Sequence, residues 1–287
     1  MSVVESPPFD AVIPFHPKDA EVLSYCIAGL RYNVKGLRHI YVVSKEPPDE
    51  DDILWIPESL FPFTKADVAA IIQSINGREG WYFQQLLKLY IFEVIADILP
   101  HVLIIDSDCV ICKPISFFSA EGKILLDFSD PVKHVPYFTH ARAVLGDVFH
   151  EVYPELSGIV DHMMVHRPIM QGLLHKIDRR GHAWRILLEA VEPAQRELSG
   201  MSEYEIYFNY VLTWFAEEYA LRKLVHGNGT SFRALTEGSA EADMISIHAW
   251  RVDLHKTQIK WSRIGGAVED ETGSGLKAPA EVQRDTQ

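Results

Sequence analysis

The chain has 287 residues, of which 47% are hydrophobic, and a formal net charge of −13. An acidic balance of this size argues against a nucleic-acid-binding surface and against a basic surface that docks on membranes. The three cysteines are too few for a disulfide framework, which favours a reducing compartment. The beginning of the sequence has no secretory pattern, and no run of about 18 apolar residues predicts a membrane span. We therefore expect a cytoplasmic protein, with at most a peripheral association with a membrane.

The first hundred residues predict an alternation of strands and helices. Residues 10–15 form an expected strand, a helix reaches about Leu30 with Pro17 and Asp19 as start signals, and residues 37–43 form a second strand. A β-α-β opening favours a parallel sheet. A short strand over residues 53–56 follows an acidic loop.

A long helix is expected from Gly80 to about Leu99, and it is apolar nearly all round, which predicts that it is buried. Gln84, Gln85 and Lys88 form a polar stripe within one sector of roughly 100°. The stripe has two interpretations. It faces solvent or nearby loops, or it faces a cleft in which Lys88 neutralises a phosphate.

The most informative segment is residues 101–110, where an apolar strand leads into Asp106, Ser107 and Asp108. Open α/β sheets bind ligands at the carboxyl ends of their strands. In an extended backbone, Asp106 and Asp108 point the same way, and their like charges favour a cation between them. Carboxylate oxygens suit Mg²⁺ or Mn²⁺ carrying a polyphosphate. The alternative is a turn in which the two aspartates cap backbone groups.

The second half of the chain continues the alternation of strands and helices. The predicted elements are a strand over residues 123–128, a helix around 141–150, a strand within 158–167, a helix over 168–180, a helix that begins within 199–207 and ends near Tyr219, and a strand over 242–250. The polar, Gly-rich tail from Gly265 is expected to be disordered.

Several polar residues in this half have competing interpretations. His162 and His166 are four residues apart but on an expected strand, so we do not expect them to form a metal pair. Ser202 and Glu205 fit a capping box, which gives Glu205 a structural role. Glu203 has no such local explanation, and the helix dipole favours its ionised form as a base. A lone strand histidine such as His248 usually belongs to the core.

Four segments together resemble a known family: residues 80–89, Asp106–Asp108, residues 162–164 and residues 202–207. Over roughly residues 10–255, the chain resembles GT-A-type glycosyltransferases with a DxD motif, and most closely the uncharacterised DUF6492 family. The resemblance implies an α/β fold with a GT-A-like, Rossmann-type mixed sheet, mainly parallel and flanked by helices. It implies one domain over residues 1–264, with a nucleotide-binding half (about 1–130) and an acceptor half (131–264), and a flexible tail over 265–287.

The resemblance also implies roles for individual residues. The implied metal ligands, for Mn²⁺ or Mg²⁺, are Asp106, Asp108 and His248. The implied donor-binding residues are Pro14, Phe15, Lys18, Gln84, Gln85, Lys88, Asp106 and Ser107, with Asp19 at the same edge. The implied catalytic residues are Glu203 and Asp161, and the implied acceptor-binding residues are His162 and Glu205.

The function implied is a metal-dependent glycosyltransferase, of hexosyl or pentosyl type, acting in polysaccharide biosynthesis. It would move a sugar from a UDP- or GDP-sugar to a glycan or other hydroxyl acceptor, with the charge that develops on the leaving diphosphate stabilised by the metal. The stereochemical outcome stays open, because a retaining route needs no base of the kind Glu203 would supply.

Three alternatives remain at this point. A haloacid-dehalogenase-like phosphatase would use Asp106 as nucleophile and Asp108 as general acid, although about a hundred residues precede the motif here. A non-catalytic nucleotide-sugar-binding protein would have the same fold. Cys109 and Cys112 resemble a redox or zinc pair, but a second ligand pair is missing.

Overall fold

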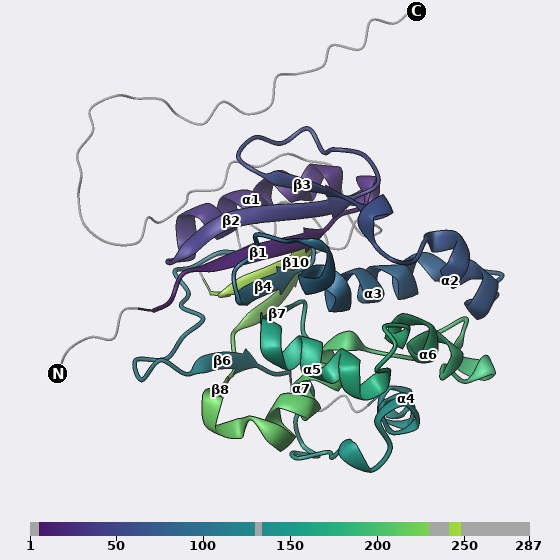
Figure 1. Ribbon diagram of the computed structural model, residues 1–287. Helices are drawn as coiled ribbons and strands as arrows, with labels where there is room; N and C mark the ends of the chain where they lie inside the picture. The colour runs from purple at the N-terminus through teal and green to yellow at the C-terminus, as the bar shows by residue number, and fades with distance from the viewer. Residues whose placement is uncertain (1–5, 130–133, 230–240, 248–287) are drawn as a thin grey trace, which may run out of the picture.

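The central feature of the computed structural model is a five-stranded sheet (Figure 1), and the structure describes residues 6–129, 134–229 and 241–247. The strand order is β3-β2-β1-β4-β7. The strands are β1 (Phe9–Pro14), β2 (Leu37–Ser44), β3 (Leu54–Pro57), β4 (His101–Ile105) and β7 (His162–His166). The first four are parallel and β7 pairs antiparallel to β4, which confirms the predicted mainly parallel α/β class.

Helices cover both sides of this sheet. Figure 1 places α1 on one side and α3, α5 and α7 on the other. The α-helices are α1 (Ala20–Asn33), α2 (Lys65–Ile72), α3 (Glu79–Val94), α4 (Val135–Leu145), α5 (Arg167–Ile177), α6 (Ala183–Glu189) and α7 (Glu203–Trp214). Short 3-10 helices are η1 (Pro17–Asp19), η2 (Glu58–Leu60), η3 (Gly146–Val148), η4 (Pro193–Gln195) and η5 (Ala216–Glu218).

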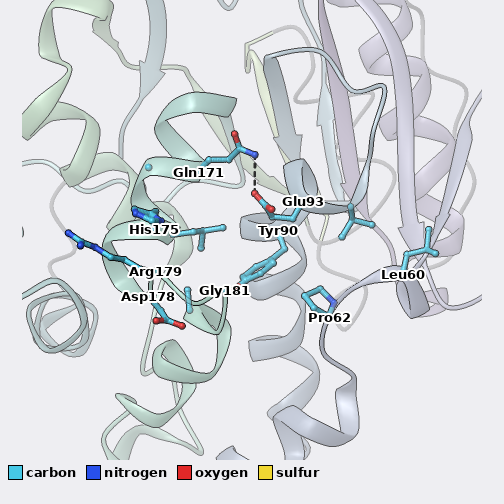
Figure 2. A pocket seen from close by; sticks show the side chains of 13 residues that line it. Leu60, Pro62, Tyr90, Glu93, Gln171, His175, Asp178, Arg179 and Gly181 are labelled. Atoms are coloured by element: carbon cyan, nitrogen blue, oxygen red, sulfur yellow. Dashed lines mark hydrogen bonds between the residues drawn. The ribbon is translucent and has the colours of Figure 1, made fainter.

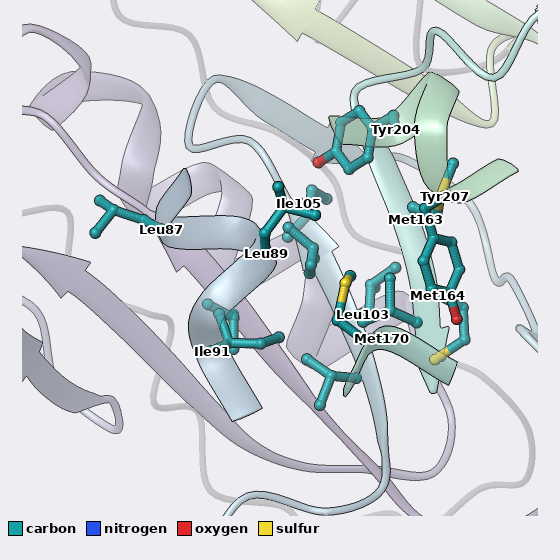
Figure 3. Packing of buried hydrophobic residues seen from close by; sticks show 14 of the residues in the cluster. Leu87, Leu89, Ile91, Leu103, Ile105, Met163, Met164, Met170, Tyr204 and Tyr207 are labelled. Atoms are coloured by element: carbon teal, nitrogen blue, oxygen red, sulfur yellow. The ribbon is translucent and has the colours of Figure 1, made fainter. Parts of the chain in front are cut away.

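The core is formed by β4 and β7 with the helices that cover them. Strand β4 is rich in aliphatic residues because it is buried on both faces, as inner strands of such sheets are. Figure 3 shows side chains of α3, β4, β7, α5 and α7 meeting there, among them Leu89, Leu103, Met164, Met170 and Tyr207. One cluster of buried residues extends from Phe9 to Met244, so the two predicted halves share a hydrophobic core.

Two small sheets complete the fold and place its C-terminal strand beside the aspartates. One has the order β5-β10-β9, and the other pairs β6 with β8. These strands are β5 (Cys109–Ile111), β6 (Ile124–Asp127), β8 (Tyr219–Arg222), β9 (His226–Gly229) and β10 (Met244–Ile247). Because Ser246 of β10 lies opposite Cys109 of β5, residues far apart in the sequence meet next to Asp108.

Some predicted boundaries are wrong for identifiable reasons. Helix α3 ends at Val94 rather than near Leu99, because Ile95 is extended (φ −97°, ψ 101°). Helix α4 begins at Val135, with a proline in its first turn, and ends at Leu145, where Gly146 has a φ of +56°. The predicted final strand is confirmed over β10, whereas residues 248–250 and the tail from 265 lie outside the described residues.

Strands β5, β8 and β9 and helices α2 and α6 were not predicted. In the described part of the chain, no helix combines the length and the apolar character that crossing a membrane requires.

Candidate active site

The segment Asp106–Asp108 forms a turn at the carboxyl end of β4. The Cys109 N–H donates to the Asp106 carbonyl over 3.1 Å, so the extended geometry predicted for the two aspartates is wrong. The chain must turn here because it leaves the five-stranded sheet and enters β5 of another. The Asp106 N–H donates to the Asp161 carbonyl (3.0 Å), and the Ile247 N–H donates to the Asp108 carbonyl (2.7 Å). Backbone hydrogen bonds thus fix the turn to the segment before β7 and to β10.

Three carboxylates gather around this turn. Burial raises the pKa of Asp106 to about 7; the Lys88 ammonium opposes the rise, and the negative charges of Asp108 and Asp161 add to it. The Asp106 side chain is nevertheless 23% exposed, so it lies at the edge of the core rather than within it. The charges of Asp106, Asp108 and Asp161 therefore act on one small volume.

A buried lysine neutralises part of this charge. Lys88 Nζ lies 2.5 Å from Asp106 Oδ1 and 2.9 Å from Glu203 Oε1, and its side chain is 5% exposed. The ammonium also lies 4.3 Å from the centre of the Tyr204 ring. Burial lowers the pKa of Lys88, but Asp106 and Glu203 outweigh it and hold this pKa well above its usual value.

The polar stripe of α3 is thereby largely explained. Lys88 faces the carboxylates, and Gln85 Oε1 accepts the Glu203 N–H over 3.1 Å, which fixes the first turn of α7 against α3. Lys88 thus lies beside the Asp106 carboxylate and Gln85 is bonded to the backbone of α7, while the interpretation in which Lys88 neutralises a phosphate stays a prediction. Gln84 is half-buried on the same helix.

A second polar cluster joins β5, β9 and β10 with the segment before β7. Ser246 Oγ donates to Asp161 Oδ2 (2.5 Å) and lies 2.8 Å from His226 Nε2 and 3.0 Å from Cys109 Sγ. His226 Nε2 lies 3.2 Å from Asp161 Oδ2. No sequence pattern indicated His226, because the strand His226–Gly229 has no apolar residue.

The residues predicted to bind the nucleoside lie at the end of β1 and directly after it. Pro14 and Phe15 are buried and Lys18 is exposed. Ser107 Oγ donates to Asp19 Oδ2 over 2.9 Å, whereas Asp19 Oδ1 is buried without a hydrogen-bond partner in the part of the chain that the structure describes. Burial raises the pKa of Asp19.

The predicted acceptor residues are both buried. His162 Nε2 lies 2.8 Å from Asp127 Oδ2, and that carboxylate also pairs with Arg222. The predicted capping box is half right, because Ser202 Oγ accepts the Glu205 N–H but the Glu205 carboxylate turns away. It accepts instead from Ser157 Oγ, the Gly158 N–H and Asn209 Nδ2.

The third implied metal ligand, His248, lies outside the described residues. Among residues 6–129, 134–229 and 241–247, no group of three or more His, Cys, Asp or Glu side chains is close enough to hold a metal ion.

Two cavities open near these elements. One, of about 510 Å³, lies between β6, β7, β8 and β9, and both His162 and His226 line it. The other, of about 740 Å³, lies between α3 and α5 (Figure 2). Polar groups of this second cavity are engaged with the protein: Glu93 accepts from Gln171 (3.0 Å), and the Tyr90 hydroxyl accepts the Trp184 N–H (2.9 Å).

Fold and site together define an α/β protein with a carboxylate-rich site at the carboxyl edge of a mainly parallel sheet. The chain belongs to the DUF6492 family, described as a family of unknown function, whose model matches residues 39–250. The resemblance to this family is thus confirmed.

No curated protein matches the chain. The crystal structure of mouse xyloside xylosyltransferase 1 in its apo form is similar, with a TM-score of 0.43 and 10% identity over 85% of this chain and 99% of that chain. A similarity this low identifies neither a donor nor an acceptor for this chain.

Proposed function

We propose that the protein is a metal-dependent glycosyltransferase that uses a nucleoside-diphosphate sugar, a UDP- or GDP-sugar. The observation that carries the proposal is the convergence of Asp106, Asp108 and Asp161 at the carboxyl end of β4, where the buried ammonium of Lys88 pairs with Asp106. Negative charge gathered in this way favours a divalent cation, and a cation there would attract a diphosphate.

The donor atoms fit such a cation in kind. Carboxylate oxygens are the ligands that Mg²⁺ and Mn²⁺ prefer, and burial of Asp106 among like charges leaves its ionised form in need of positive charge. In this proposal Asp108 and Asp106 hold the ion. His248 directly follows Ile247, whose N–H bonds to the Asp108 carbonyl, and it is the proposed third ligand. The ion would supply positive charge that stabilises the leaving diphosphate.

The chain's own residues would bind and orient the two substrates. Asp19 Oδ1, buried and unpaired among the described residues, would accept a hydrogen bond from the nucleoside at the edge formed by Pro14, Phe15 and Lys18. Lys88 holds Asp106 in place and offsets its charge. In this geometry Lys88 would act on a bound phosphate indirectly, by positioning Asp106. Donor binding by Gln84, Gln85 and Ser107 remains part of the proposal.

Two carboxylates were predicted to be catalytic, and they differ in access. The Glu203 side chain is 7% exposed and paired with Lys88, whereas the Asp161 side chain is 30% exposed and therefore open to solvent. We therefore assign Glu203 to positioning Lys88 and Asp161 to the acceptor side of the reaction. Glu205 is fully buried among protein donors, and acceptor binding by it stays a prediction.

Calorimetric titration tests the proposal. UDP and GDP are titrated with and without Mn²⁺ against the wild type, Asp108→Asn and Asp147→Asn, the last a control at an exposed aspartate. We expect Mn²⁺-dependent binding of one nucleotide that Asp108→Asn abolishes and Asp147→Asn keeps, with thermal unfolding unchanged in both. Unchanged binding in Asp108→Asn would refute the assigned site.

Two other results would point to the alternative functions. Absence of nucleotide binding with any metal would refute the transferase and make a phosphatase assay of Asp106 and Asp108 the next step. Tight nucleotide binding without turnover of any sugar nucleotide would indicate a non-catalytic binding protein.

A further inference from the structure

The cavity of about 510 Å³ beside the carboxylates has the size of a small-molecule site. It is lined by the ends of β6 and β7, by the segment from β8 to β9 and by β10, so segments far apart in the sequence enclose it. The apolar part of its wall consists of Phe128, Ile159, Val160, Leu224, Val225 and Met244.

His162, one of the residues that line the cavity, has a ring nitrogen without a hydrogen-bond partner among the described residues. His162 is 4% exposed, and its Nε2 lies 2.8 Å from Asp127 Oδ2. Because a carboxylate only accepts, Nε2 carries the hydrogen and Nδ1 carries the lone pair. Nδ1 is buried without a hydrogen-bond partner in the described part of the chain, a condition that costs free energy until a donor arrives.

The orientation of the His162 ring is fixed from behind. The guanidinium of Arg222 binds Asp127 through two nitrogens, at 2.6 and 2.7 Å, so the carboxylate that holds His162 is itself held. Such a buried network holds the His162 ring in one orientation beside the cavity, with Nδ1 as the ring atom left to accept a hydrogen bond.

A second histidine connects the cavity with the carboxylate site. His226 lines the same cavity, and its Nε2 contacts Asp161 Oδ2 (3.2 Å) and Ser246 Oγ (2.8 Å). Asp161 in turn accepts the Asp106 N–H through its carbonyl. Asp161 thus lies between the cavity and the carboxylates that are proposed to hold the metal.

We propose that this cavity is the acceptor subsite and that it takes a sugar, with His162 and His226 binding sugar hydroxyls. Imidazole nitrogens that bind hydroxyl groups, next to an apolar wall, suit a sugar ring, which has hydroxyl groups at its edge and C–H groups on its faces. The inference rests on the proposed transferase function for the identity of the bound sugar as acceptor, but the binding itself is measured separately.

The test measures the binding of methyl and p-nitrophenyl glycosides of common hexoses and pentoses, by ligand-observed NMR and calorimetry, with UDP or GDP and Mn²⁺ present and absent. Three variants probe the cavity: His162→Gln, His226→Ala and Leu224→Trp, which fills the cavity without removing a polar group. Leu60→Trp is the matched control, because Leu60 lines the other cavity.

We expect at least one glycoside to bind the wild type, with affinity reduced about tenfold or more by each cavity variant and unchanged by Leu60→Trp, since one lost hydrogen bond to a buried group corresponds to about a factor of ten. Leu224→Trp keeps the test decisive if a histidine variant fails to fold.

Two results would overturn the inference: binding that the three cavity variants leave unchanged, or no binding of any glycoside to the wild type. Nucleotide binding in the same samples reports on the proposed function separately. If glycosides bind in the cavity while no nucleotide binds, the transferase proposal fails and the sugar site stands.

Discussion

Lys88 is the residue on which the geometry of the site depends most. Its ammonium is removed from water and lies between Asp106, in the turn after β4, and Glu203 at the start of α7. Taking a charge out of water is costly, so each of these groups is stable only while the others are present. The same three residues therefore determine both the geometry of the carboxylate site and part of the stability of the fold.

Lys88→Met is expected to lower the free energy of unfolding by about 3–5 kcal/mol, because it leaves buried carboxylates without their cation. Urea denaturation measures this change. Arg185→Ala is the control, since it removes the exposed i,i+4 pair with Glu189 and should cost less than about 1 kcal/mol. A Lys88→Met variant as stable as the wild type would show that the ion pairs contribute no net stability.

The buried imidazole of His140 makes the stability of the fold depend on pH. Burial lowers its pKa to about 4, and its Nε2 lies 2.7 Å from the Leu187 carbonyl of α6. In the unfolded chain the pKa of histidine is about 6.5, so between these values the unfolded state binds more protons. This contribution to stability is complete above about pH 6.5 and is lost as the pH falls toward 4, at up to about 1.4 kcal/mol per unit.

His140→Gln keeps a donor for the Leu187 carbonyl but cannot be protonated in this range. Its free energy of unfolding should therefore fall less than that of the wild type between about pH 7 and about pH 5, as measured by urea denaturation. His101, whose pKa burial also lowers to about 4, leaves part of the pH dependence in the variant. Equal losses in the two proteins would contradict the role of His140.

At the scale of elements, helix α1 positions the small sheet that carries the aspartate turn. A Cβ atom at Gly29 would lie 2.8 Å from the carbonyl oxygen of Ile111 in β5, so the helix and the strand touch through their backbones. Glycine is required at this position by the close approach rather than by its backbone angles. The close packing of β5 against α1 therefore fixes the path that the chain takes directly after Asp108.

Gly29→Ala and Gly172→Ala form a matched pair of substitutions in helix interiors. At Gly172 in α5 the nearest atom to an added Cβ is the Tyr210 hydroxyl at 3.7 Å, so alanine should raise stability by up to about 1 kcal/mol through helix propensity. Gly29→Ala should instead lower it by about 1–3 kcal/mol, because backbone atoms must move. Thermal unfolding compares the two, and a stabilised Gly29→Ala would mean that α1 and β5 can separate freely.

At the scale of the whole molecule, hydrophobic patterning was sufficient for the main architecture. The apolar run before Asp106 and the buried character of residues 80–94 predicted β4 and α3, since tertiary packing agrees there with local periodicity. The short strands β5 and β9 were missed, because three or four residues carry no measurable period and His226–Gly229 has no apolar residue at all.

The site was predictable in its centre and less so in its partners. Asp106 and Asp108 stood out because two carboxylates follow a buried strand. Their partners are set by long-range contacts: Glu203 meets Lys88 across 115 positions, and Ser246 meets Asp161 across 85. No local pattern specifies which distant side chain completes a cluster, so His226 and Ser246 required the fold.

The pairing of β5 with β10 has a consequence for how the protein is made. Cys109 and Ser246 are 137 positions apart, so at about 5–20 residues per second the ribosome adds the second strand roughly 7–27 s after the first. During that interval the newly made chain contains the aspartate turn but not the strand whose backbone and serine fasten it. A growing polypeptide thus completes its site only once β10 has been made, and a chain that stopped before Met244 would contain the five-stranded sheet without the strand that fastens the aspartate turn.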